Sequence, residues 1–261
     1  MKKFFVIGNK ASESLSPLIF NYWFKKYKIK AKYSFVEVSK SEFDKVLTKK
    51  IKDKKIKGFN VTIPYKKTII KHLEIKDVHA QRIGAVNCVT LGKKTKGSNT
   101  DWIGYLRSLR HVKINKRKNI LIFGCGGASQ AIVYGLLSKG FNNIFIFNRT
   151  KKIINHNNIK IYTKSYSVIG KHLEKAQLII NTTPTNPLNK QQTKLINEGV
   201  VVSDIVYRPK QTTFLNNFNK NKKIYGISML IEQAIPCFFS WFGFKPVVDE
   251  GLIKKLNLKI K

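Results

Sequence analysis

The segment KNILIFGCGGASQAIVYGLLSKGFNNIFIFNRT, residues 118–150, decides the fold prediction. An apolar run leads into a glycine-rich turn, a stretch with helical spacing follows, and a second apolar run ends the segment. This order of strand, turn, helix and strand predicts a βαβ unit, in which the two strands lie parallel in one sheet.

The glycine turn predicts a dinucleotide-binding site. In such folds the first glycine makes the turn, the second lets the backbone approach the pyrophosphate, and the helix N-terminus supplies N–H donors. Here the candidate cofactor-binding residues are Gly124, Gly126, Gly127 and Ala128, and the third glycine of the fingerprint is replaced by Ser129. A tight packing turn is the alternative.

The end of the second predicted strand indicates which dinucleotide binds. NAD enzymes usually carry Asp or Glu there to bind the ribose hydroxyls, whereas this chain has Asn148, Arg149 and Thr150. No carboxylate repels a 2′-phosphate, and a guanidinium is placed to bind one. We therefore expect NADP rather than NAD, the alternative for Arg149 being an ordinary exposed arginine.

Composition limits the class of protein. The chain has 261 residues, of which 43% are hydrophobic and 11% aromatic, so it suits one large globular domain or two modest ones. No apolar run is long enough to span a bilayer, and the first apolar run is too short for a secretory signal. We expect a cytoplasmic protein with no membrane partner. The three widely spaced cysteines and five histidines predict neither a disulfide framework nor a metal site.

The formal net charge is +36, because 50 Lys and Arg residues face 14 Asp and Glu residues. Such a field attracts polyanions, so nucleic-acid binding is one interpretation. However, only six of the basic residues are arginine, and proteins that read bases and phosphates favour its bidentate fork. Lys, Asn and Ile have A+T-rich codons, so genome composition explains the bias equally well, and we expect no specific nucleic-acid partner.

The remaining sequence predicts a second α/β domain. Strand patterns at KFFVIG, AKYSFVEV and IKGFNVTI alternate with helical patterns at SPLIFNYWFKKY and SKSEFDKVLTKKI, the latter with a capping Ser and Glu near its start. AVNCVTLGKKTKGSNTD predicts a hairpin, and SMLIEQAIPCFFSWFGF predicts a helix that is broken or bent around Pro236. The fold class is therefore α/β, with an N-terminal domain built on a mostly parallel sheet and a Rossmann-type domain.

Polar clusters lie at the ends of several predicted elements in the N-terminal region. They are SESLSP with Ser14 and Ser16, NVTIPYK with Asn60, Thr62 and Lys66, GAVNC with Asn87, and NTD with Asn99, Thr100 and Asp101. Each alone is ordinary turn chemistry. In this order, and followed by FNRT, DIVYRPKQTT and GISMLIEQA, they resemble the shikimate dehydrogenase family over nearly the whole chain.

The resemblance implies a reaction and a site. Members of this family reduce 3-dehydroshikimate to shikimate with NADPH, in the biosynthesis of aromatic amino acids. It implies that Lys66 and Asp101 form the catalytic acid–base pair, Lys66 being otherwise one more solvated lysine. The implied substrate-binding residues are Ser14 and Ser16 for the carboxylate, Thr62, Asn87 and Asp101 for the ring hydroxyls, and Tyr207 and Gln233. The implied contacts around the nicotinamide are Val206, Gly226 and Met229.

The same resemblance implies domain boundaries. Residues 1–101 and 231–261 would form the substrate domain, and residues 102–230 the NADP domain. A homodimer is a further expectation. Two positions depart from the family: Ile153 lies near the place of a second phosphate-binding arginine, and Gln130 stands where a basic residue often follows the glycine turn. Both changes are expected to weaken the preference for NADPH.

Three other functions compete with this one. A quinate/shikimate dehydrogenase often uses NAD, which Arg149 and the pair Ser14 and Ser16 argue against. A methylene-tetrahydrofolate dehydrogenase shares the two-domain plan but not the polar clusters. A nucleic-acid-binding protein on an old enzyme fold fits the charge, yet all the expected site residues are present.

Overall fold

The structure is a computed structural model that describes residues 1–156 and 159–260. Residues 157, 158 and 261, which the predicted domain ranges include, lie outside the described residues. The chain divides into two compact units, and each is described by itself. Unit 1 comprises Met1–Thr100 and Gln233–Asn257, and unit 2 comprises Asp101–Glu232 and Leu258–Lys261.

Unit 1 is built on a six-stranded sheet with the strand order β2-β1-β3-β5-β6-β4. Its strands are β1 (Lys2–Gly8), β2 (Ala31–Glu37), β3 (Ile56–Val61), β4 (Ile75–Lys76), β5 (Cys88–Leu91) and β6 (Thr95–Ser98). Strand β1 runs parallel to β2 and β3, whereas β5 is antiparallel to β3 and β6. The antiparallel β5–β6 pair confirms the predicted hairpin.

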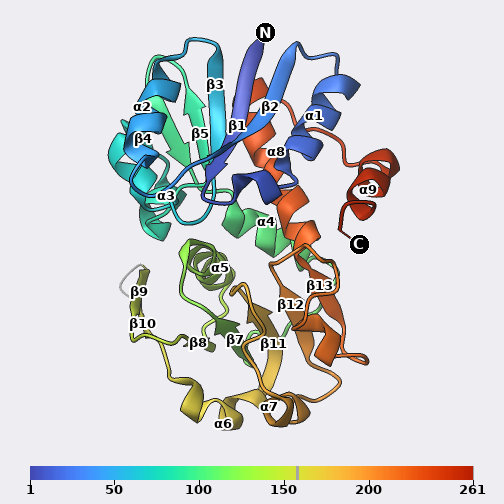
Figure 1. Cartoon of the computed structure of the whole chain (residues 1–261). Helices are drawn as coiled ribbons and strands as arrows, with labels where there is room; N and C mark the ends of the chain where they lie inside the picture. Colours follow the sequence, from blue (N-terminus) through green and yellow to red (C-terminus); the bar gives the residue numbers. More distant parts are fainter. Residues whose placement is uncertain (157–158, 261) are drawn as a thin grey trace. The chain divides into compact units, whose positions relative to one another are not determined.

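Helices cover both faces of this sheet (Figure 1). They are η1 (Ala11–Glu13), α1 (Ser16–Lys26), α2 (Phe43–Lys52), η2 (Thr68–His72), α3 (Val78–Ile83), α8 (Gly226–Phe242) and α9 (Glu250–Asn257), of which α8 begins in unit 2. Successive side chains of a strand point to opposite faces of the sheet, so helices on both faces are needed to bury the apolar side chains of β1. Phe4 packs against Phe24 of α1 and Trp241 of α8, whereas Phe5 stacks on Phe59 in the core beneath α2.

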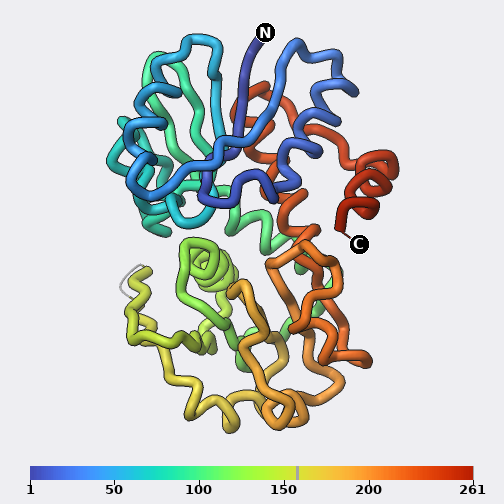
Figure 2. Tube along the Cα trace, viewed as in Figure 1, coloured from blue at the N-terminus to red at the C-terminus, as the bar shows by residue number. Residues whose placement is uncertain are grey.

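Helices far apart in the sequence lie side by side in unit 1. The C-terminal helix α9 packs beside α1, as the path of the chain shows (Figure 2). Just before α9, Asp249 accepts hydrogen bonds from Tyr22 and Lys26 of α1. The Trp23 indole donates to the Val247 carbonyl at 3.1 Å. These contacts anchor the end of the chain to its first helix.

Unit 2 contains a five-stranded parallel sheet with the strand order β13-β12-β11-β7-β8. Its strands are β7 (Asn119–Phe123), β8 (Ile144–Phe147), β11 (Ala176–Asn181), β12 (Val201–Asp204) and β13 (Lys223–Tyr225), and a separate antiparallel pair is formed by β9 (Ile153–His156) and β10 (Ile159–Tyr162). The parallel β7–β8 pair, joined by α5 (Gly127–Ser138), confirms the predicted βαβ unit.

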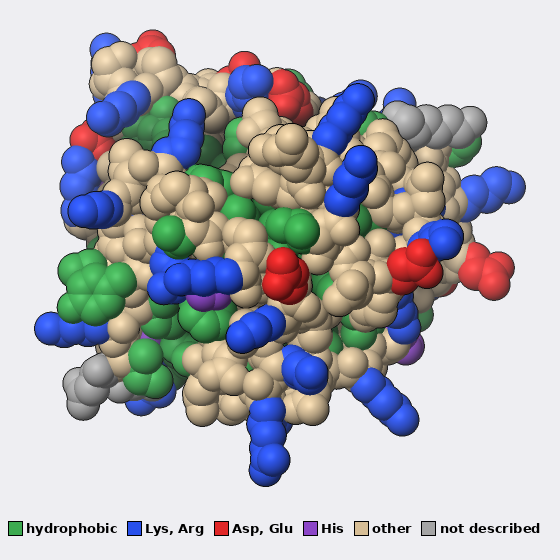
Figure 3. Space-filling view, turned by 90° about the horizontal axis from the view of Figure 1, so that it is seen from below, with side chains coloured by type: hydrophobic (Ala, Val, Ile, Leu, Met, Phe, Trp, Pro, Cys, Tyr) green, Lys and Arg blue, Asp and Glu red, His purple; other side chains and the backbone are tan. Residues whose placement is uncertain are grey.

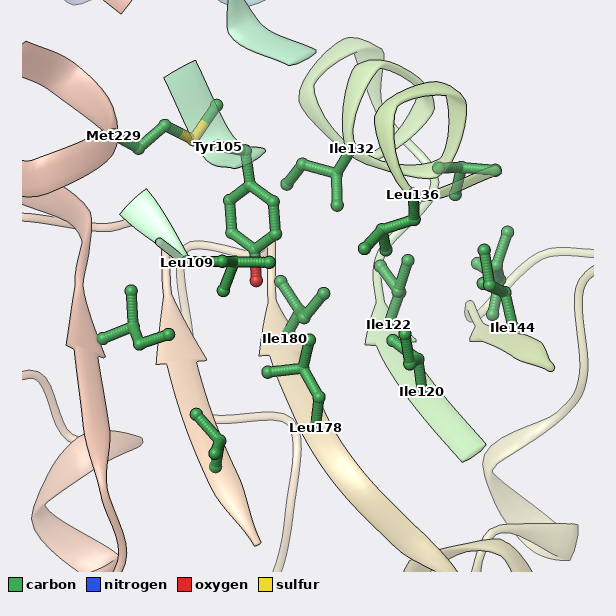
Figure 4. Close-up of a cluster of buried hydrophobic side chains, with 14 of the residues drawn as sticks. Tyr105, Leu109, Ile120, Ile122, Ile132, Leu136, Ile144, Leu178, Ile180 and Met229 are labelled. Atoms are coloured by element: carbon green, nitrogen blue, oxygen red, sulfur yellow. The ribbon is translucent and has the colours of Figure 1, made fainter. Parts of the chain in front are cut away.

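The two faces of this sheet bury separate cores. On one face, Tyr105 and Leu109 at and beyond α4 (Asp101–Ser108), together with Ile132 and Leu136 of α5, point toward strand residues such as Ile180 (Figure 4). The other face packs under η3 (Tyr166–Val168), α6 (Gly170–Leu173) and η4 (Leu215–Asn217). It also packs under Leu188 and Ile196, which flank α7 (Lys190–Lys194). Strand residues are buried on both sides, which explains their continuous apolar runs.

Two local expectations need correction: the helix expected to be broken or bent around Pro236 is not broken there, and the helix expected to be capped by Ser and Glu is not capped. Helix α8 continues unbroken from Gly226 to Phe242 with Pro236 inside it. Proline removes one helical hydrogen bond, but Phe238 is completely buried in the aromatic cluster that holds this helix on the sheet. Helix α2 begins at Phe43 without a side-chain cap, because no side-chain oxygen accepts from the first helix N–H groups; Ser39 instead donates to the Glu42 carboxylate.

Among the residues that the structure describes, no helix is both long enough and apolar enough to cross a membrane. Lys and Arg side chains are scattered over the face shown in Figure 3 rather than gathered into one stripe, with few acidic side chains among them. On that face the positive charge is therefore spread out and does not form one continuous basic patch.

Candidate active site

The predicted catalytic lysine follows the end of β3. Ile63–Pro64 is a cis peptide, and the next residue, Tyr65, is buried with its ring stacked on Phe43 at 4.1 Å between centroids. The Tyr65 hydroxyl donates to the Val38 carbonyl at 2.8 Å. The Lys66 carbonyl accepts from Val86 N at 2.7 Å. The backbone of Lys66 is thus held beside the segment that carries Asn87, with Lys66 half-buried and Lys67 exposed.

Other predicted substrate residues lie at the same edge of the sheet. Strands β1 and β3 are parallel, so their carboxyl ends meet, and Thr62 N donates to the Ile7 carbonyl at 2.9 Å. Ser14 lies in the connection that follows β1, and its hydroxyl accepts from Ser16 N at 3.2 Å at the start of α1. Ser16 is buried and Ser14 half-buried. Binding sites of α/β folds commonly form at this end of the strands.

Asn87 is the centre of a buried polar network in unit 1. Its Oδ1 accepts from Thr100 N at 2.7 Å, which fixes the orientation of the amide. Its Nδ2 donates to Thr100 Oγ1 at 2.9 Å and to Gln233 Oε1 at 3.2 Å. The structure thus brings together the predicted residues Asn87 and Gln233, which are far apart in the sequence.

The sequence did not indicate two members of this network, Tyr33 and Cys237, and it named Asn60 and Thr100 only as members of the polar clusters. Asn60 Nδ2 donates to the Asn87 carbonyl at 2.9 Å and to Cys237 Sγ at 3.2 Å, while Asn60 Oδ1 accepts from the Tyr33 hydroxyl at 2.7 Å. Cys237 stands four residues after Gln233 on α8, a spacing that puts two side chains on one helix face. That spacing could have identified Cys237, whereas nothing local in the sequence pointed to Tyr33.

The glycine turn of unit 2 joins β7 to α5 and fits a dinucleotide. Gly124 has a φ of +94°, and a Cβ there would lie 2.6 Å from Thr182 Oγ1. Gly126, the N-cap of α5, would direct a Cβ into open space with no atom within 4 Å. Gly127 and Ala128 form the first turn of α5. An unfilled space beside a helix N-terminus is what an approaching pyrophosphate requires.

The predicted phosphate-binding residues follow β8, next to this turn. Gly124 N donates to the Phe147 carbonyl at 2.8 Å, which joins the two segments. Asn148 Nδ2 donates to the carbonyl of Thr150 at 2.8 Å and so shapes the turn, and Arg149 is exposed. Burial raises the pKa of the nearby Tyr166 hydroxyl, and the positive charge of Arg149 opposes that rise.

A third segment of unit 2 carries Val206 and Tyr207 and is held by a buried carboxylate. Asp204 accepts from Val206 N at 2.9 Å, from Thr212 Oγ1 at 2.7 Å and from Asn181 Nδ2 at 3.2 Å. The pKa of Asp204 is raised from its ordinary value because burial outweighs these hydrogen bonds. Sequence reasoning did not single out Asp204.

The start of α8 packs against the segment that carries Val206 and Tyr207. A Cβ on Gly226 would lie 2.3 Å from the Ile205 carbonyl oxygen, so the helix and the segment approach closely. Met229 is buried in the core of unit 2. Among the described residues, no group of His, Cys, Asp and Glu side chains could hold a metal ion.

The predicted site residues therefore fall into two groups. Unit 1 carries Ser14, Ser16, Thr62, Lys66, Asn87 and Gln233, whereas unit 2 carries Asp101, Tyr207 and all the predicted cofactor residues. Asp101 is buried and is the first residue of α4. It directly follows Thr100, which is hydrogen-bonded to Asn87, so the chain itself keeps Asp101 one residue from the network of unit 1.

Comparisons with known proteins show the family to which the chain belongs. The profile of the shikimate dehydrogenase substrate-binding domain matches residues 6–89. The chain is 38% identical over 251 residues to the shikimate dehydrogenase (NADP(+)) of Clostridium beijerinckii, covering 92% of each protein.

Solved structures give the same result. The structure resembles the shikimate dehydrogenase of Aquifex aeolicus with a TM-score of 0.84 and 31% identity, covering 98% of this chain and 97% of the other. It resembles the Thermus thermophilus shikimate 5-dehydrogenase, in complex with NADP(H) and shikimate, with a TM-score of 0.82 and 25% identity, covering 100% of both chains. The predicted fold class is confirmed, and this chain belongs to the shikimate dehydrogenase family.

Proposed function

We propose that this chain catalyses the reversible, NADPH-dependent reduction of 3-dehydroshikimate to shikimate. The observation that carries the proposal is the combination of the Asn87–Gln233 amide network in one unit with the open glycine turn and Arg149 in the other. The NADP(+)-dependent relatives, and the complex of one of them with NADP(H) and shikimate, support the same substrate and cofactor.

The proposed chemistry assigns different tasks to the two units. When bound, NADPH supplies a hydride for the ring carbonyl carbon. Lys66 provides a proton or a positive charge at the carbonyl oxygen, and Asp101 accepts a hydrogen bond from the same oxygen once it is a hydroxyl. Asn87, Gln233, Thr62 and Tyr207 orient the ring by its hydroxyl groups.

The remaining residues bind the ends of the two ligands. Ser14 and Ser16 donate hydrogen bonds to the substrate carboxylate. Gly126, Gly127 and Ala128 present backbone N–H groups to the pyrophosphate, and Val206, Gly226 and Met229 border the nicotinamide. On this proposal unit 1 is the substrate domain and unit 2 the NADP domain.

A direct assay tests the proposal. Purified protein is mixed with shikimate and NADP, then with NAD and with quinate, while reduced nicotinamide is followed by absorbance. Reduction with shikimate and NADP alone is expected. Equal rates with NAD or quinate would move the chain to the quinate/shikimate branch, and no turnover by folded protein with any pair would overturn the enzyme assignment.

Arg149→Ala should change the cofactor preference. A charge-assisted contact with the 2′-phosphate contributes about 1.5–3 kcal/mol, so KM for NADP should rise about 10- to 100-fold. KM for NAD, which lacks that phosphate, should stay within about twofold of wild type. The matched control is Arg208→Ala, another exposed arginine of unit 2. An equal change in KM for both cofactors would contradict the assignment of Arg149.

Gly126→Ala should separate cofactor binding from folding. The added methyl group meets no atom within 4 Å, so the free energy of unfolding should fall by no more than the roughly 1 kcal/mol that alanine costs at an N-cap. The same methyl group would occupy the space of the pyrophosphate, so KM for NADP should rise about tenfold or more. Kinetics and thermal unfolding measure the two effects.

Gly124→Ala provides the contrast. Its φ of +94° and the contact with Thr182 make an added Cβ unfavourable without any cofactor, so this variant should lower the unfolding temperature. If Gly126→Ala bound NADP as wild type does, the pyrophosphate would not lie at this turn.

Two further expectations belong to the same proposal. The enzyme works in the cytoplasm without a membrane or a specific nucleic-acid partner, which a salt series of DNA retention tests. A homodimer stays a prediction, for which light scattering coupled to gel filtration is the measurement.

A further inference from the structure

Cys237 occupies an unexpected place for a cysteine. It is completely buried, and its Sγ lies 3.2 Å from Asn60 Nδ2 and 3.2 Å from Thr100 Oγ1. It forms no disulfide. Its neighbours are instead the polar side chains that surround Asn87, so the sulfur is part of the hydrogen-bond network described above.

The hydrogen-bond directions show what the sulfur does. Asn60 Nδ2 has two hydrogens, of which one goes to the Asn87 carbonyl at 2.9 Å and the other is directed at Cys237 Sγ. The sulfur is therefore an acceptor for Asn60. Because Asn60 Oδ1 accepts from the Tyr33 hydroxyl at 2.7 Å, this amide has one favoured orientation.

Thr100 links the sulfur to the amides that we propose bind substrate. Its Oγ1 accepts from Asn87 Nδ2 at 2.9 Å, so its own hydrogen is available for another acceptor. Three acceptors are in reach of it: Cys237 Sγ and Asn87 Oδ1, each at 3.2 Å, and Gln233 Oε1 at 3.4 Å. Cys237 therefore competes with Asn87 and Gln233 for this hydroxyl, and the direction that the hydroxyl takes affects both amides.

A second cysteine, Cys88, lies next to Cys237. Cys88 stands opposite Asn60 in the β3–β5 ladder, so its side chain lies on the same face of the sheet as Asn60. A hydrogen bond with Cys237, together with burial, raises the pKa of the Cys88 thiol well above its usual range. A buried neutral thiol is a poor nucleophile.

We propose that Cys237 is a positioning residue, whose sulfur orients Asn60 and Thr100 and thereby holds Asn87 and Gln233 in the arrangement that binds the substrate hydroxyls. This inference rests on the proposed function. Cys237 does not touch the reacting atoms, so its removal should affect substrate affinity more than the rate of the chemical step.

Cys237→Ala should raise KM for shikimate about 5- to 10-fold, because an Asn60 hydrogen and the Thr100 hydroxyl both lose a buried partner. KM for NADP should stay within about twofold, since the proposed cofactor residues belong to the other unit. Cys237→Ser restores a small hydroxyl donor and acceptor, so it should recover at least part of the lost affinity. The serine variant also keeps the test possible if the alanine variant fails to fold.

Cys88→Ala is the matched control. It removes the same atoms from another completely buried site of unit 1, in strand β5, so it should lower the unfolding temperature by a similar amount. Its KM for shikimate should rise much less than that of Cys237→Ala, because Cys237 loses only its contact with Cys88 and keeps those with Asn60 and Thr100. Equal KM values in the Cys88→Ala and Cys237→Ala variants would overturn the positioning role.

Asn87→Ala separates this inference from the proposed function. If it raises KM for shikimate strongly while Cys237→Ala behaves like Cys88→Ala, the substrate site stands and the role of Cys237 is wrong. If Asn87→Ala leaves KM for shikimate unchanged, both the substrate site and the inference about Cys237 are overturned.

Discussion

Lys66→Ala should lower kcat for shikimate oxidation by about 100- to 10,000-fold, the usual contribution of a positioned acid or base. The backbone of Lys66 is held by the buried neighbour Tyr65 and by the hydrogen bond from Val86 N. The side chain is half-buried rather than part of the core. The variant should therefore fold as wild type does, and thermal unfolding together with steady-state kinetics checks both statements.

Lys67→Ala is the matched control, because it removes the same charge from the next, exposed position. It should retain kcat within about twofold, which separates the role of Lys66 from the general field of a chain with charge +36. Added methylamine should partly restore the rate of Lys66→Ala by supplying a protonated amine to the vacated space. Near-normal turnover of Lys66→Ala would show that Lys66 carries no proton and stabilises no charge.

The fold was largely predictable because its signals are local. The strand–turn–helix–strand pattern of residues 118–150 predicts β7, α5 and β8 from apolar spacing and glycine positions alone. The β5–β6 hairpin was likewise predictable, because polar Gly and Lys residues separate its two strands in the sequence. The unbroken helix α8 was not predictable, since proline normally ends a helix. Its continuation depends on packing of Phe238 and Trp241 against residues more than 200 positions earlier.

The site was only partly predictable, for the same reason. The glycine turn was predictable because Gly124 and Gly126 are close in the sequence. In the structure Gly124 has the positive φ of a tight turn, and Gly126 leaves open space beside the helix N-terminus. The association of Asn60 with Tyr33 and Cys237 joins three distant segments of the chain. No sequence spacing relates these segments to one another. The network that surrounds Asn87 could therefore be identified only from the structure.

Asp204→Ala should lower the free energy of unfolding of the protein by about 2–4 kcal/mol. The change removes the acceptor of three hydrogen bonds and leaves the Thr212 hydroxyl and Asn181 amide without that partner in a buried site. The change also removes the hydrogen-bond acceptor of Val206 N, which we propose lies in the segment beside the nicotinamide. KM for NADP should therefore rise as well. Urea unfolding and NADP kinetics measure the two effects, and a variant as stable as wild type would contradict the role of this carboxylate.

The same carboxylate gives the stability a distinct pH dependence. Burial raises the pKa of Asp204 above its ordinary value near 3.8, so the native state holds this proton more tightly than the unfolded state does. The contribution of Asp204 to stability is complete below about pH 3.8, and it is lost as the pH rises through the raised native pKa. The stability difference between wild type and Asp204→Asn should therefore grow in favour of wild type as the pH falls from 7 toward 4.

Asp44→Asn is a control with the opposite sign. Hydrogen bonds from Lys71 and His72 lower the pKa of this exposed carboxyl below its ordinary value. Its contribution is present above about pH 3.8 and is lost as the pH falls through the lowered native pKa. The stability advantage of wild type over Asp44→Asn should thus shrink on acidification, while that over Asp204→Asn grows. Parallel curves for the two variants would mean that burial does not dominate at Asp204, and that its hydrogen bonds hold it as a charged anchor for the Val206 segment.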